Sequence, residues 1–183
     1  AAVSALSHDA VDELFGEIRD VAADRQREEV FDRMKLIRVR PSGLPSDAIP
    51  YDARDDTQLV EHIAYHDSAG EQRLCELAEE YLINDNEGSS QFLLCGPPTS
   101  IRGAVDKIAP LLIDVDELKR DSDYPPSAWE LLEEGKSDLF DLGVVDEASM
   151  MDLPQLFLAG AFLRADGQML LAGDHRQMQP IQS

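Results

Sequence analysis

Cysteine and lysine are scarce in this sequence, and it has no long apolar segment. The two cysteines, Cys75 and Cys95, stand 20 positions apart, which excludes a disulfide framework and a zinc-ligand cluster. The longest apolar run, Leu156 to Leu163, has eight residues, whereas a membrane-spanning helix needs about 20. The N-terminal residues show no basic segment before a short apolar one, which a secretory signal would have. The sequence therefore predicts a cytoplasmic protein with no membrane partner.

Basic residues are also few. The chain has 16 Lys plus Arg, only four of them Lys, against 37 Asp plus Glu, for a formal charge of -21. Leu, Ile, Val and Phe nevertheless make up 48 of the 183 residues, above the roughly 20% below which a highly charged chain stays disordered. We therefore expect a folded core, in one α/β domain or a domain with an insertion. A dense carboxylate surface keeps proteins soluble in concentrated salt, and we favour a halophilic origin over ordinary acidity.

Strand and helix patterns alternate along the chain. Apolar residues from Val11 to Val21 recur at helical spacing and predict a helix over residues 9–30, after a short strand that ends near Ala5. Further strands are expected at residues 35–40, 91–95, 142–145 and 168–172, and further helices at residues 101–112 and 154–164, with Gly167 as a helix stop. This order predicts an α/β fold, with a parallel sheet covered by helices on both faces.

Two acidic segments interrupt that order. Residues 45–90 carry a charge of -10, with helical patterns around Leu59 and Ile63 and again from Leu74 to Leu82. We interpret this segment as an acidic helical insertion. Residues 114–141 carry a charge of -7 around a short helix that holds Trp129, and we interpret them as a second acidic excursion.

The strongest chemical signal is the segment LGVVDEAS. It places Asp146 and Glu147 at the carboxyl end of an apolar strand, which is the sheet edge where ligands bind in α/β proteins. One carboxylate there can hold Mg²⁺ while its neighbour polarises an attacking water, as phosphoryl transfer requires. A solvated strand end would show the same pair, so the pair alone leaves the function open.

A second segment, LLAGDHRQMQPI, begins with a strand about 25 residues further on. The loop after this strand carries Asp174 and Gln177. A glutamine at that edge can hydrogen-bond a terminal phosphate or the attacking water. The order and spacing of the two segments therefore favour a nucleotide site.

These segments resemble the superfamily 1 helicases, most closely the Upf1-like DNA and RNA helicases. VVDEASMMDLPQLF is similar to their motif II, the Walker B element, and GDHRQMQPIQ is similar to their motif III. The N-terminal ALSHDAVDELFGEI resembles motif Ia, KLIRVR resembles the strand that follows it, and CGPPTSIRGAV resembles a later turn that touches phosphates. The resemblance implies a RecA-like P-loop NTPase fold that spans nearly the whole chain.

The resemblance also implies roles for individual residues. Asp146 would organise Mg²⁺, Glu147 would act as catalytic base, and Gln177 would sense the γ-phosphate of ATP, with Asp174 beside it at the nucleotide. The positions implied to contact single-stranded DNA or RNA are Ser7, His8, Thr99, Ser100 and Arg102. The function implied is ATP-driven translocation on a nucleic-acid strand, or its unwinding.

The family's phosphate-binding loop, motif I, has no counterpart in these residues. Gly96 to Thr99 looks like the start of such a loop, but Arg102 and Gly103 follow where Gly-Lys-Thr is required. We therefore expect a fragment, residues 1–183, of a first RecA-like domain. Its partners would be the P-loop segment and the second RecA-like domain with its arginine finger. Alone, the fragment is expected to be inactive.

Other functions stay open. A degenerate NTPase relative that serves as an interaction module would keep the fold and lose the chemistry. A metal-dependent hydrolase would combine Asp146 and Glu147 with His62 and His66, which stand four apart on an expected helix, although a solvated helix face explains that spacing better. The only basic stretch, residues 25–40 at +3, is either a nucleic-acid contact surface or an ordinary helix end and strand.

Overall fold

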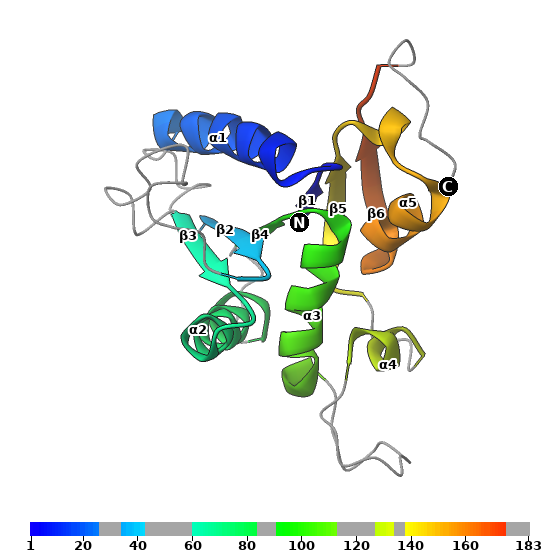
Figure 1. Ribbon diagram of the computed structural model, residues 1–183. Helices are drawn as coiled ribbons and strands as arrows, with labels where there is room; N and C mark the ends of the chain where they lie inside the picture. Colours follow the sequence, from blue (N-terminus) through cyan, green and yellow to red (C-terminus); the bar gives the residue numbers. More distant parts are fainter. Residues whose placement is uncertain (26–33, 43–59, 84–90, 113–126, 134–137, 175–183) are drawn as a thin grey trace.

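A computed structural model describes the fold of most of the chain (Figure 1). The residues that it describes are 1–25, 34–42, 60–83, 91–112, 127–133 and 138–174. Six strands form one sheet, all parallel, with helices against both faces. The predicted parallel α/β architecture is confirmed.

The strands of the sheet do not follow their order in the sequence. They are β1 (Ala2–Ser4), β2 (Met34–Arg40), β3 (Val60–Ala64), β4 (Gln91–Cys95), β5 (Phe140–Val145) and β6 (Leu163–Leu171). Across the sheet the order is β3-β2-β4-β1-β5-β6. The strand β1 thus lies inside the sheet, where Val3 is aligned with Cys95 of β4 and Ser4 with Val145 of β5. Because all six strands are parallel, their carboxyl ends meet at one edge.

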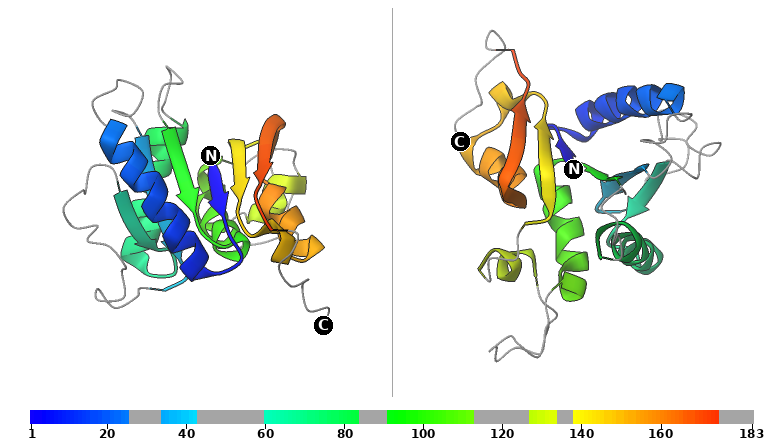
Figure 2. Two further views of the ribbon diagram at one scale, coloured as in Figure 1. Left: turned by 90° about the horizontal axis from the view of Figure 1, so that it is seen from above. Right: turned by 180° about the vertical axis from the view of Figure 1, so that it is seen from behind.

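The helices divide unequally between the two faces (Figure 2). The helix α1 (His8–Arg25) crosses one face alone, while α2 (Ser68–Ala78), α3 (Pro98–Leu112), α4 (Ala128–Glu133) and α5 (Leu153–Gly160) lie on the other. Parallel crossovers are right-handed, so the direction of each connection decides its face. The chain runs from β1 towards the β3 edge through α1, and from β4 towards the β6 edge through α3.

Each face of the sheet has its own apolar core. Between the sheet and α1 lie Val3, Ala5, Val11, Phe15, Leu36 and Cys95. The larger core lies under α2 and α3, where α3 buries Ile101, Ala104, Val105, Ile108 and Ala109. The helix expected at residues 101–112 is therefore confirmed. Cys95 is buried, Cys75 is half-buried and both are free thiols, in agreement with a packing role.

The helix expected around Ile63 is wrong. Residues Val60–Ala64 form β3, which pairs with the carboxyl half of β2 at the edge of the sheet. Two apolar residues four apart, Leu59 and Ile63, fit a helix, but pairing with β2 offers this segment backbone partners that local periodicity does not reveal. The helix expected from Leu74 onward is confirmed as α2, which continues as one π-helical turn over Glu79–Ile83. These elements belong to the sheet and to the layer that covers it.

The helix predicted over residues 154–164 ends early, at Gly160, and β6 begins at Leu163 rather than at residue 168. Gly167 lies inside this strand and does not stop a helix. A Cβ atom there would lie 3.0 Å from the carbonyl oxygen of Arg164 and 3.2 Å from that of Asp141. The close approach coincides with a register shift between β5 and β6, and a glycine in a strand is typical of such irregularities.

The start of α5 agrees with the sequence. Pro154 lies in its first turn, and Asp152 and Gln155 form a capping box in which each side chain accepts the other residue's backbone N–H. Elsewhere, the part of the chain that the structure describes contains no helix long and apolar enough to cross a membrane.

Candidate functional site

The Asp146 carboxylate stands directly after β5, at the carboxyl edge of the sheet. Its backbone N–H donates to the Ser4 carbonyl of β1 at 2.9 Å. One carboxylate oxygen, Oδ1, accepts the N–H of Glu147 at 2.8 Å. Among the described residues the other oxygen, Oδ2, has no hydrogen bond. The structure thus holds one Asp146 oxygen in place and leaves the second free to take a cation.

Glu147 has φ 53° and ψ 26°, and it is the only residue other than glycine with positive φ in the described part of the chain. This left-handed conformation costs on the order of 1 kcal/mol and occurs often at functional sites. It turns the chain sharply into a 3-10 turn over Ala148–Met150. The strain therefore falls on the predicted catalytic base.

The turn after β5 packs tightly against the end of β6. The N–H of Ala148 donates to the Ala172 carbonyl at 2.8 Å. A Cβ atom on Gly173 would lie 2.9 Å from the backbone nitrogen of Ser149. Small residues at positions 148, 149 and 173 therefore make this close approach possible.

The side chains that follow Asp146 in the chain offer oxygen atoms as possible metal ligands. The buried Ser149 hydroxyl has no hydrogen-bond partner in the described residues, and Glu147 is half-buried beside it. No group of three or more His, Cys, Asp or Glu side chains in the described residues could hold a metal. Mg²⁺ usually binds one or two carboxylates together with substrate phosphates, and Asp146 and Glu147 are the residues that could supply those carboxylates.

Asp174 follows β6 and is exposed at the same edge as Asp146. The ends of β5 and β6 are joined by the N–H of Ala172, which donates to the Val145 carbonyl at 2.8 Å. The expected neighbourhood of Asp146 and Asp174 on adjacent strands is therefore present. Gln177 lies outside the described residues, so its predicted role stays a prediction.

Ser7 and His8 lie at the other side of Asp146, after β1. The Ser7 hydroxyl accepts the N–H of Ala10 at 3.1 Å and so caps α1. Ser7 is exposed and His8 is partly exposed. A hydroxyl that accepts one hydrogen bond can still donate another, so the cap leaves Ser7 able to contact a phosphate.

The first turns of α3, which follows β4, carry Thr99, Ser100 and Arg102, and of these only Thr99 is exposed. Ser100 is 3% exposed, and its side chain hydrogen-bonds Tyr65. Arg102 pairs with Asp106 at 3.2 Å, with its guanidinium 5.7 Å from the Trp129 ring of α4. The contacts of Arg102 are thus with residues of α3 and α4, and its predicted role at nucleic acid stays a prediction.

Gly96, in the segment that looks like a phosphate-binding loop, has a packing role. A Cβ atom there would lie 3.0 Å from the Val39 side chain of β2. Its N–H donates to the Val3 carbonyl at 3.0 Å. A close approach between strands explains this glycine without a phosphate.

The turns after β1 and β4 flank a topological switch point. These two strands are neighbours, but their connections leave in opposite directions, through α1 and α3. Ligands of open α/β sheets bind in the crevice outside such a point. Ser7 and His8 on one side and Thr99 on the other are therefore well placed for a ligand.

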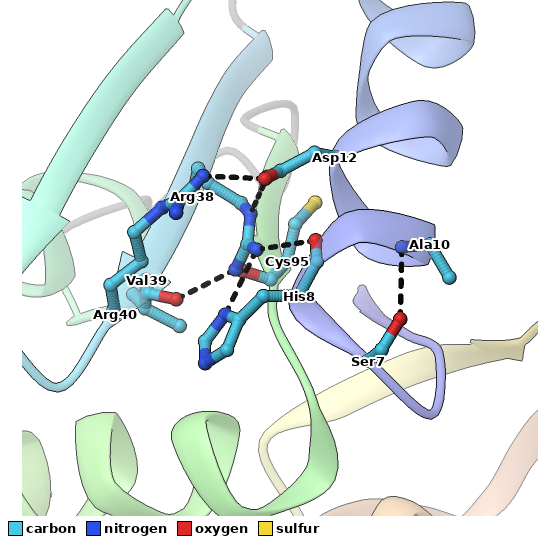
Figure 3. A network of polar contacts seen from close by, with 8 residues as sticks. All are labelled: Ser7, His8, Ala10, Asp12, Arg38, Val39, Arg40 and Cys95. Carbon is cyan, nitrogen blue, oxygen red and sulfur yellow. Dashed lines mark hydrogen bonds and ion pairs between the residues drawn. The ribbon is translucent and has the colours of Figure 1, made fainter. Parts of the chain in front are cut away.

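A buried charge network lies under α1, between β2 and β4 (Figure 3). Asp12 of α1 accepts from Arg38 at 2.6 Å and from Arg40 at 2.6 Å, one through each carboxylate oxygen. Arg38 is fully buried and also donates to the carbonyl oxygens of Val39, at 2.8 Å, and Cys95, at 3.5 Å. Burial, partly offset by Asp12, lowers the pKa of Arg38.

The described part of the basic stretch is thus internal. On the opposite face of β2, Lys35 is buried and pairs with Glu61 at 2.7 Å. Burial alone would raise the pKa of Glu61, but hydrogen bonds from Arg73 and Lys35 lower it overall. Lys35, Arg38 and Arg40 therefore serve the fold and leave no contact surface on β2. The remainder of the stretch lies mostly outside the described residues.

The two histidines four apart do not share a helix. His62 lies in β3 against Phe15 of α1, with ring centroids 5.8 Å apart, and His66 is exposed in the turn that follows. Burial and the nearby Arg40 and Arg38 lower the pKa of His62 to about 4. The paired metal site considered for a hydrolase therefore loses its geometric basis.

Sequence reasoning missed the network around Arg38.

Comparison of the chain with protein-family models, with curated proteins and with solved structures finds no match.

Proposed function

We propose that this chain is part of an ATP-dependent helicase or translocase of the superfamily 1, Upf1-like type, acting on single-stranded DNA or RNA. The observation that carries the proposal is the direct junction of its two candidate sites. One candidate site is the nucleotide site at Asp146, and the other is the nucleic-acid contact at Ser7 and His8. The backbone N–H of Asp146 donates to the carbonyl of Ser4, which stands three residues before Ser7. A shift at either end is therefore passed to the other through one short segment.

In this proposal each half has a separate task. ATP and Mg²⁺, held together with a P-loop segment, supply the phosphoryl group and the charge that balances it. Asp146 binds the cation, and Glu147 takes a proton from the attacking water. Ser7, His8 and Thr99 hold the nucleic-acid backbone. Gln177 reports the nucleotide state.

Among the described residues β6 is an edge strand of the sheet. Leu170 and Leu171 on this edge strand are 58% and 54% exposed. Unpaired, apolar edge strands are usually covered. In the motor that we propose, a further strand would pair with the backbone of β6.

ATP hydrolysis stimulated by single strands tests the proposal. In a protein that carries these residues with a P-loop and a second motor domain, single-stranded DNA or RNA should raise the hydrolysis rate. Glu147→Gln should reduce it by about 10² or more, while Glu133→Gln, on α4, should leave it unchanged. Hydrolysis that ignores both the strand and Glu147 would contradict the proposal.

The 183 residues alone should not hydrolyse ATP appreciably. Their sequence contains no Gly-Lys-Thr loop, and an arginine finger alone is worth about 10³ to 10⁵ in rate. Turnover by the chain itself that disappears in Asp146→Asn would show that this expectation is wrong.

An interaction module without catalysis is the second candidate. The exposure of Leu153 and Phe157 on α5, at 68% and 75%, favours it, because exposed apolar patches mark interaction sites. A protein of this class would lack a functional P-loop. Absence of ATP binding by the protein that contains this chain would favour the module over the motor.

A further inference from the structure

Arg38 holds His8 at two points. One terminal guanidinium nitrogen lies 3.0 Å from the His8 carbonyl oxygen and 3.1 Å from its ring nitrogen Nδ1 (Figure 3). Arginine has five N–H donors and no acceptor, and it stays protonated in proteins. The Nδ1 atom must therefore accept, which leaves the ring proton on Nε2.

We propose that Arg38 is a positioning residue that fixes His8 as the neutral Nε2–H tautomer, so that the start of α1 presents a hydrogen-bond donor to the nucleic-acid backbone. The strand-contact part of this inference rests on the proposed function. The tautomer part rests on the contacts of Arg38 alone.

The charges around His8 act in the same direction. Burial lowers its pKa most, and Arg38 and Arg40 lower it further, while Asp12 and Asp9 partly oppose them. The charged groups that act on His8 come from both elements around it: α1 supplies the two carboxylates and β2 supplies the two guanidinium groups. The ring of His8 therefore loses its proton more readily than the ring of a free histidine.

The second ring nitrogen of His8 is available for a ligand. It points away from the charge network (Figure 3) and has no hydrogen bond within the described residues. Phosphate oxygens accept hydrogen bonds from neutral donors as well as from cations. A neutral donor suits a chain with a charge of -21, because it contributes to binding even where salt screens charges.

Arg38 also connects the two sides of the switch point. Its other terminal nitrogen donates to Cys95, the last residue of β4, while the first binds His8 at the start of α1. Thr99, in the first turn of α3, follows Cys95 by four residues. The buried Arg38 side chain thereby links the two segments that we propose to hold the nucleic-acid strand.

The tautomer can be measured on the unsubstituted chain. In a ¹⁵N-histidine-labelled sample at pH 7, the His8 signals are identified by their absence in His8→Gln. The unprotonated ring nitrogen resonates far downfield of the protonated one. We expect Nδ1 to be the unprotonated atom. A proton on Nδ1, or on both nitrogens, would overturn the assignment.

Arg38→Lys separates positioning from a general structural role. Lysine keeps the positive charge but lacks the several N–H donors that the guanidinium group holds in a fixed geometry. The His8 tautomer should therefore become mixed, and the affinity for a fluorescent dT₂₀ strand should fall about three- to tenfold. Arg19→Lys, on the helix α1 that begins with His8, is the matched control and should change neither readout. An unchanged tautomer in folded Arg38→Lys would count against the inference. If that variant does not fold, the spectrum of the unsubstituted chain still decides it.

The two readouts distinguish two failures. The expected tautomer without any strand binding would contradict the proposed function and the strand-contact part, and would leave the hold on His8 intact. Strand binding with the wrong tautomer would contradict the role of Arg38 and leave the proposed function standing. His8→Gln retains a donor and an acceptor, so it should bind the strand more tightly than His8→Phe.

Discussion

The backbone N–H of Asp146 donates to the carbonyl of Ser4 across 2.9 Å. This hydrogen bond joins the turn after β5, which carries the Asp146 carboxylate, to the last residue of β1. The same two strands are aligned from Ala2 to Ser4. The chemistry that we propose at Asp146 and the nucleic-acid contacts that we propose at Ser7 and His8 therefore share one hydrogen-bonded junction.

Gly173→Ala should disturb the turn after β5. Its methyl group would lie 2.9 Å from the Ser149 nitrogen, so the turn must shift, at a cost of about 1–3 kcal/mol. Gly16→Ala in α1 is the control, because nothing lies within 4 Å of its Cβ position. That change should stabilise the helix by up to about 1 kcal/mol. Urea unfolding measures both, and equal effects would contradict the close approach.

Asp12→Asn should be strongly destabilising. Asp12 balances two buried guanidinium groups, those of Arg38 and Arg40. Removal of one partner from a buried ion pair costs about 3–5 kcal/mol. The exposed Asp9→Asn on the same helix is the control, with an effect near zero. A loss below about 1 kcal/mol in Asp12→Asn would show that water replaces the carboxylate.

His62 should make stability depend on pH. Its pKa is about 4 in the fold and about 6.5 in an unfolded chain, so the unfolded state binds the proton first. The free energy of unfolding should therefore fall as pH decreases from about 6.5 to about 4. The pKa difference corresponds to about 3 kcal/mol, which partial solvent exposure reduces to about 2 kcal/mol. Denaturant titrations should show a smaller decrease in His62→Gln than in the exposed His66→Gln, and equal decreases would contradict this role.

High salt should stabilise the fold. A net charge of -21 repels itself, and salt screens that repulsion over about 10 Å at 0.1 M and about 3 Å at 1 M. The melting temperature should rise between 0.1 and 1 M KCl. A melting temperature that is flat or falls over this range would contradict salt adaptation.

Strong local periodicity made β2, β4 and α3 predictable. β2 alternates apolar and basic residues, β4 is a short apolar run, and the apolar residues of α3 recur at helical spacing. The strand β3 was missed because its five residues fit a helix equally well until β2 provides a pairing edge. The length of β6 was missed because Gly167 looks like a helix stop in the sequence alone. Its close approach to the backbone of Asp141 on β5 shows only in the structure.

The candidate site divides in the same way. The place of Asp146 and Glu147 was predictable, because two carboxylates directly after a short apolar strand lie at the carboxyl edge of a parallel sheet; their roles stay predictions. The network of Arg38 was not, since its partner Asp12 lies 26 residues away. One signal was nevertheless present: Asp12 stands between Val11 and Phe15 on the buried side of α1. An acid there requires basic partners across the core, and the alternation of Arg38 and Arg40 supplies them.

The affinity for a single strand, with and without a non-hydrolysable ATP analogue and Mg²⁺, tests the coupling of the two sites most directly. The measurement uses a protein that carries these residues together with a P-loop and a second motor domain. Coupling free energies between linked sites are typically about 1–3 kcal/mol, so the nucleotide should change strand affinity by about fivefold or more, and Asp146→Asn should abolish the change. Equal strand affinity in both conditions, with the nucleotide shown to be bound, would contradict the account.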